Sequence, residues 1–169
     1  STAVGGFIFQ STTFALPKVF DERLAELGIS ATVVGWYAFI VFAFAAIGQL
    51  IVGGLLDRCS VRLVFPAVVF LQAAFLGLMP GLSGTAALAV AVAFMLVVFG
   101  QIPINDVLIS RVAQSEWRSR AYALRYIVTF SVSASSIPFV AWIHSGWGFD
   151  SLFTVLSVAA ACILIPVLA

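Results

Sequence analysis

The sequence predicts an all-α membrane protein with six transmembrane helices, and two observations support this class. The chain of 169 residues is 63% hydrophobic and only 9% charged, whereas soluble domains carry about 25% charged residues. Its apolar residues also gather into six runs, and a helix needs about 20 such residues to cross a bilayer. The runs are Thr2–Pro17, Ala31–Leu56, Arg62–Pro80, Thr85–Ser110, Ala121–His144 and Phe149–Ala169.

The first run is the shortest of the six. About 16 helical residues extend only about 24 Å, which is less than the roughly 30 Å of the hydrocarbon core. We therefore expect the first helix to lack its beginning. After Pro17, the segment Lys18–Gly28 places Phe20, Leu24 and Leu27 on one face, which predicts a short amphipathic extension that ends at its glycine.

A short charged turn joins the second and third runs. Ser30 is a suitable N-cap for the second run, and the turn at its other end holds Asp57, Arg58 and Arg62. A charged side chain at mid-membrane costs about 2.5–3.5 kcal/mol, so this turn is expected at the membrane surface. The third run then carries one polar interruption, Gln72.

The second half of the chain is more polar. The fourth run follows an uncharged turn at Gly81–Gly84 and contains several polar residues near its end, the fifth run opens with Arg125, and the uncharged turn Ser145–Gly148 precedes the last run. A second charged loop, Arg111–Arg120, separates the fourth and fifth runs. The polar positions at the end of the fourth run are Gln101, Asn105 and Asp106, with Pro103 among them.

The basic residues predict the orientation, because cytoplasmic loops carry an excess of Lys and Arg. The second and fourth turns hold these residues, whereas the third and fifth hold none. We therefore expect the second turn, the fourth turn and both termini to be cytoplasmic. The basic residues are Arg58, Arg62, Arg111, Arg118 and Arg120, and an aromatic belt of Trp36, Trp142 and Trp147 is expected at the opposite interface.

Polar side chains in membrane helices face the bundle interior or a water-filled cavity. The first run offers Gln10 to Thr13 and the fourth offers Gln101 and Asn105, four residues apart and on the same face as Phe94. Because the first helices of both triads carry polar clusters, we expect two three-helix inverted repeats around a central path. The candidate substrate-binding residues are Gln10, Thr13, Phe94, Gln101 and Asn105. Alternatively, the amides only join neighbouring helices, a contact worth about 0.6 kcal/mol.

Asp106 is the one carboxylate well inside a run. It is interpreted either as a proton-coupling group or as the partner of Arg125 in an ion pair. The ion pair, acting as a gate or as a static link between helices, is the favoured interpretation.

Three motifs resemble the major facilitator superfamily of secondary transporters. The turn Gly53-x-Leu55-x-Asp57-Arg58-x-x-x-Arg62 resembles the signature loop of that family, although Ser60 and Val61 replace its usual glycine and basic residue. The segment Glu116-x-Arg118-x-Arg120 resembles the start of the eleventh helix, and Gly146–Phe153 resembles the start of the twelfth.

This resemblance implies helices seven to twelve, the C-terminal half of a secondary active transporter that moves a small solute by alternating access. A missing N-terminal half or a second copy would complete it in the bilayer, with a proton as a candidate coupling ion and the bacterial inner membrane as the location. The implied gating or coupling residues are Asp57, Arg58, Arg62, Asp106 and Arg125. Arg58 and Arg62 also fit an alternative in which they anchor the turn to anionic headgroups.

Other classes find less support in the sequence. A non-transporting membrane assembly module remains an alternative, and Ser83 and His144 allow a rhomboid-like serine protease as a remote one, although we expect no enzyme. A net charge of +1 without a basic patch argues against nucleic acid as a partner. Cys59 and Cys162 have no neighbouring His or Cys, so we expect neither a metal site nor a cofactor.

Overall fold

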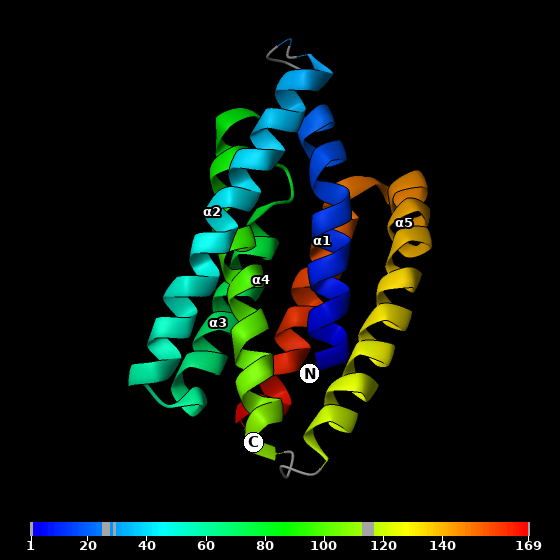
Figure 1. Cartoon of the computed structure of the whole chain (residues 1–169). Helices are drawn as coiled ribbons and strands as arrows, with labels where there is room; N and C mark the ends of the chain where they lie inside the picture. The colour runs from blue at the N-terminus through cyan, green and yellow to red at the C-terminus, as the bar shows by residue number, and fades with distance from the viewer. Residues whose placement is uncertain (1, 25–27, 29, 113–116, 169) are drawn as a thin grey trace.

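The computed structural model describes residues 2–24, 28, 30–112 and 117–168, and in these residues all regular structure is α-helical. Figure 1 shows the helices side by side as a bundle, with the first and last described residues both toward one end. The elements are α1 (Thr2–Arg23), α2 (Ala31–Arg58), α3 (Val61–Leu78), α4 (Gly84–Val112) and α5 (Arg118–Leu168).

Helix α5 consists of two arms, 118–147 and 149–168, that meet at Gly148. This residue has φ 74° and ψ −177°, a backbone conformation that glycine adopts at little cost because it has no Cβ. The chain reverses at this point, so that the second arm runs back beside the bundle (Figure 1). The fifth and sixth apolar runs therefore both lie in α5, and the expected turn at Ser145–Gly148 is reduced to a break at its last residue.

The first helix is longer than its apolar run. Helix α1 continues through Pro17 to Arg23 and has 22 residues, a length of about 33 Å. Pro17 therefore does not separate a membrane run from an amphipathic extension, and residues 25–27 of that extension lie outside the described part of the chain. Ser30 occupies the N-cap position of α2 with an extended backbone, but its side chain makes no capping hydrogen bond.

Four of the described helices are long and apolar enough to cross a membrane, namely α2, α3, α4 and α5. The candidate span in α5, Tyr122–Ile165, has 44 residues, about twice the length that one crossing needs. Helix α1 is not among the four, and charged residues occupy its last turns. The chain is an integral membrane protein, as the sequence predicted.

Helix packing places apolar side chains both inside the bundle and on its surface. Helix α2 packs against α4, α3 packs against α4 and α5, and α1 lies between α4 and α5. The Ser157 hydroxyl donates to the Ala73 carbonyl at 2.8 Å and so joins the second arm of α5 to α3. Large apolar side chains such as Leu50 and Phe130 are exposed, as expected for a surface that contacts lipid tails.

Two glycines bring α2 and α4 into close contact. A Cβ atom added to Gly48 would lie 2.5 Å from the carbonyl oxygen of Leu96. A Cβ atom on Gly100 would lie 2.7 Å from Cγ2 of Val52. Small residues are the usual means by which membrane helices approach closely, and the α2–α4 crossing depends on them.

Polar contacts fasten the end of α1 to two other segments. The Arg23 guanidinium pairs with Asp150 and donates a hydrogen bond to the Leu82 carbonyl at 2.7 Å. The backbone N–H of Gly81 donates to the same Asp150 carboxylate at 3.0 Å. One arginine therefore joins the end of α1, the α3–α4 turn and the beginning of the second arm of α5.

We predict that Arg23→Gln lowers the free energy of unfolding by about 1–2 kcal/mol, because hydrogen bonds to charged groups contribute about 1.5–3 kcal/mol and Asp150 is half exposed. Thermal denaturation of the detergent-solubilised protein measures the change. Lys18→Gln is the matched control, since the Lys18–Asp21 pair is exposed on both sides and its loss should leave the unfolding temperature unchanged. Equal losses in the two variants would contradict the assigned role of Arg23.

Candidate functional site

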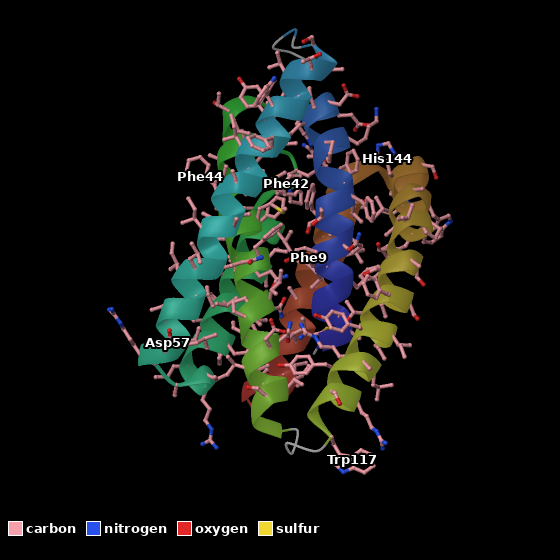
Figure 2. All side chains as sticks on the ribbon, in the orientation of Figure 1. Phe9, Phe42, Phe44, Asp57, Trp117 and His144 are labelled. Atoms are coloured by element: carbon pink, nitrogen blue, oxygen red, sulfur yellow. The ribbon has the colours of Figure 1, made fainter. Side chains whose placement is uncertain are left out.

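A small cavity of about 160 Å³ lies between α1, α4 and the first arm of α5. Phe9 reaches it from α1 and packs against Phe99 of α4, with ring centroids 5.0 Å apart; Figure 2 shows Phe9 where these helices meet. The walls combine apolar groups with two amides, a hydroxyl and a guanidinium. The lining residues are Gly5, Gly6, Phe9, Val98, Gln101, Ile102, Asn105, Arg125 and Thr129.

Three polar atoms of the cavity walls are buried without a hydrogen-bond partner in the described part of the chain. They are Nε2 of Gln101, Oδ1 of Asn105 and Oγ1 of Thr129. Gln101 and Asn105 are only 3% and 7% exposed, and an unsatisfied buried donor or acceptor costs about 1–3 kcal/mol. The three residues that carry these unsatisfied atoms all line the cavity, which makes it the candidate site for a bound molecule.

Two consecutive glycines of α1 make room for these walls. A Cβ atom on Gly5 would lie 3.0 Å from Oε1 of Gln101, and one on Gly6 would lie 3.2 Å from Cγ2 of Thr129. The α1 backbone thus approaches α4 on one side and α5 on the other. Gly5, Gly6, Phe9 and Thr129 were not predicted from the sequence as site residues. The two adjacent glycines within an apolar run were the available signal.

Arg125 connects the cavity to Asp106. Arg125 lines the cavity, and its guanidinium forms an ion pair with the Asp106 carboxylate. The Tyr122 hydroxyl donates to the Asp106 carbonyl at 3.2 Å. The side chain of Arg125 is 14% exposed and that of Asp106 is 48% exposed. The expected contact is present, and its role as a gate stays a prediction.

Pro103 lies within α4 between the two amides, and the helix continues through it. Because proline has no N–H, the carbonyl of Phe99 receives no helical hydrogen bond from this position. The α4 backbone next to the cavity therefore has one acceptor outside the regular helical ladder.

The other candidate substrate-binding residues do not line this cavity. Phe94 is completely buried and packs against Phe153, with ring centroids 5.7 Å apart. The Thr13 hydroxyl donates to the Phe9 carbonyl of its own helix at 2.7 Å, and Gln10 is partly buried on α1. A role for these three in substrate binding stays a prediction.

The charged turn lies at one end of the bundle. Asp57 and Arg58 end α2, Arg62 lies in the first turn of α3, and all three are exposed. Figure 2 shows Asp57 at that end of α2. None of them forms an ion pair with a described residue. Glu116, which opens the second predicted motif, lies outside the described residues.

The residues of the remote protease alternative lie near the opposite end. Nε2 of His144 is 2.8 Å from Oε1 of Glu22, while Ser83 is exposed in the α3–α4 turn. The described residues contain no hydrogen bond between Ser83 and His144. They also contain no group of three His, Cys, Asp or Glu side chains placed to hold a metal ion.

Comparison with known proteins gives one match. The family model described as Major Facilitator Superfamily matches residues 1–169, the full length of the sequence and all five helices. Comparisons with curated proteins and with solved structures give no match.

Proposed function

Because the chain belongs to the major facilitator superfamily, a superfamily of membrane transporters, we propose that it is the C-terminal half of a secondary active transporter. In this proposal it contains helices seven to twelve and moves a small solute by alternating access. A second half, from the N-terminal side or from another copy, forms the opposite wall of the path. The bacterial inner membrane is the proposed location, with both termini in the cytoplasm.

The proposal divides the helices into two triads. Helices α1, α2 and α3 form the first triad, and α4 with the two arms of α5 forms the second. Transporters built from inverted repeats bind their substrate where the repeats meet. The leading helices of the two triads, α1 and α4, both line the 160 Å³ cavity, which supports this division.

The unsatisfied buried amides are the observation that carries the proposal. A chain that only assembles with others gains nothing from burying Gln101 Nε2 and Asn105 Oδ1 without partners. A transporter needs such groups, because a solute that loses its hydrating water in the path needs hydrogen-bond partners from the protein. We place Gln101 and Asn105 in direct contact with the solute, and the Asp106–Arg125 pair beside them as a gate.

Cysteine labelling tests water access without knowledge of the solute. We expect Gln101→Cys and Asn105→Cys, in a background lacking Cys59 and Cys162, to react with a charged, membrane-impermeant methanethiosulfonate reagent, because the reactive thiolate requires water. Ile47→Cys is the control, since Ile47 is exposed on the apolar outer surface of α2 and should stay unlabelled in lipid.

For alternating access, we expect the same cysteine to be labelled from either side of the membrane. Right-side-out and inverted vesicles of the complete transporter test the two sides separately. Labelling from one side alone would favour a fixed cavity in an assembly module. Absence of labelling from both sides would refute the solute path.

A further inference from the structure

A second and larger cavity lies apart from the candidate solute site. It has a volume of about 410 Å³ and lies between α2, α3 and α4. Its walls are aliphatic except at Gly48 and Cys59. This volume is within the range of about 300–1,000 Å³ found for ligand pockets, and we call the cavity the α2–α3 groove.

The groove exists because α2 and α3 separate after the turn that joins them. Helix α2 packs closely on α4 through Gly48, whereas α3 packs on α4 and on α5, and α2 and α3 contact each other little. The groove opens to the outside, since its lining residues Ile51 and Leu63 are 56% and 72% exposed. Both helices are candidate membrane spans, so lipid tails are able to reach the groove from the hydrocarbon phase.

Two basic residues belong to the α2–α3 turn at one end of the groove, although neither lines the groove itself. Cys59 lines it at the turn, and Arg58 and Arg62 immediately precede the lining residues Cys59 and Leu63. Both arginines are exposed, and neither is paired with a described carboxylate. Asp57 is the one carboxylate in the turn, so the turn has an excess of positive charge that attracts anionic headgroups.

We propose that the α2–α3 groove is a binding site for one anionic phospholipid. Its phosphate pairs with Arg58 and Arg62, and one acyl chain follows the groove past Leu63 and Ala67 toward Gly48. From Cys59 to Gly48 the groove extends about 16 Å along α2. The site is separate from the cavity at Gln101, so it does not depend on the identity of the solute or on the proposed transport.

Native mass spectrometry of the purified protein tests this proposal. The protein is titrated with phosphatidylglycerol and with phosphatidylcholine of identical acyl chains. We expect phosphatidylglycerol to bind about 10-fold more tightly, because only its headgroup has a net negative charge for the arginines. The double variant Arg58→Gln, Arg62→Gln should remove this preference, so that both lipids bind equally. Ala67→Phe fills the groove and should weaken the binding of both lipids about 10-fold.

Two matched variants control for the loss of a positive charge and for the added side-chain volume on α3. Arg120→Gln removes an exposed arginine that lies over the Trp117 ring of the other charged loop, and Ala74→Phe enlarges an exposed α3 residue outside the groove. Both should bind phosphatidylglycerol as the unchanged protein does.

Equal binding of the two lipids, or unchanged phosphatidylglycerol binding in either the arginine double variant or Ala67→Phe, would overturn the proposal. Loss of a dimer peak in Ala67→Phe without loss of lipid binding would instead assign the groove to a second copy of the chain, and would also overturn it.

Discussion

Replacing Gly48 with alanine is expected to destabilise the folded protein by about 2–3 kcal/mol, the typical cost of overpacking. The added Cβ would lie 2.5 Å from the Leu96 carbonyl oxygen, which belongs to the backbone of α4 and has no rotamer to adopt. The α2 and α4 helices must therefore separate along their whole contact. Thermal or SDS-induced unfolding of the purified protein measures the loss.

Gly35→Ala is the matched control for this prediction. Gly35 is on the same helix, and a Cβ atom there meets nothing within 4 Å. Since alanine favours helix over glycine by about 1 kcal/mol, Gly35→Ala should leave stability unchanged or raise it. Opposite signs for the two substitutions are expected, and a stable Gly48→Ala variant would mean that α2 and α4 lie farther apart than described.

The second prediction is that the double variant Gln101→Met, Asn105→Leu gains about 1–3 kcal/mol of stability while it loses its solute site. Both replacements keep roughly the original side-chain volume. They remove the unsatisfied Nε2 of Gln101 and Oδ1 of Asn105, and removing such groups relieves a desolvation cost of about 1–3 kcal/mol. The expected measurements are a higher unfolding temperature and an at least 10-fold slower solute uptake by the complete transporter.

Gln49→Met is the control for the double variant, because Gln49 is only partly buried on α2 and is not among the unsatisfied groups. Its stability should change by less than about 0.5 kcal/mol. A destabilised double variant would indicate that the two amides hold neighbouring helices together, which is the alternative interpretation of this polar stripe.

Hydrophobic runs predicted most of the helices, because a membrane helix must satisfy its backbone internally whatever its neighbours are. The rule that polar side chains avoid lipid also led to Gln101 and Asn105, which line one cavity, whereas Arg125 was predicted only as the partner of Asp106. Phe94 was harder to place. It shares a helical face with Gln101, but two turns away that face meets Phe153 instead of the cavity, and helical periodicity does not identify the neighbouring helix.

Backbone packing could not be predicted from the sequence. Gly5, Gly6, Gly48 and Gly35 are all glycines within helices, yet the first three contact neighbouring groups and Gly35 faces open space. Composition does not distinguish them, since the difference arises only where two helices cross. Thr13 was likewise ambiguous, because a hydroxyl in a membrane helix is satisfied equally well by its own backbone.

The sharp reversal at Gly148 links two parts of the chain mechanically. Only one residue, Gly148, separates the two arms of α5. The second arm is hydrogen-bonded to α3 through Ser157. The first arm carries Arg125 and Thr129, which line the cavity. We therefore expect a tilt of the first arm to displace α3 and Asp150, the partner of Arg23. In the proposed transport cycle, we therefore expect these helices to move together as one rigid unit.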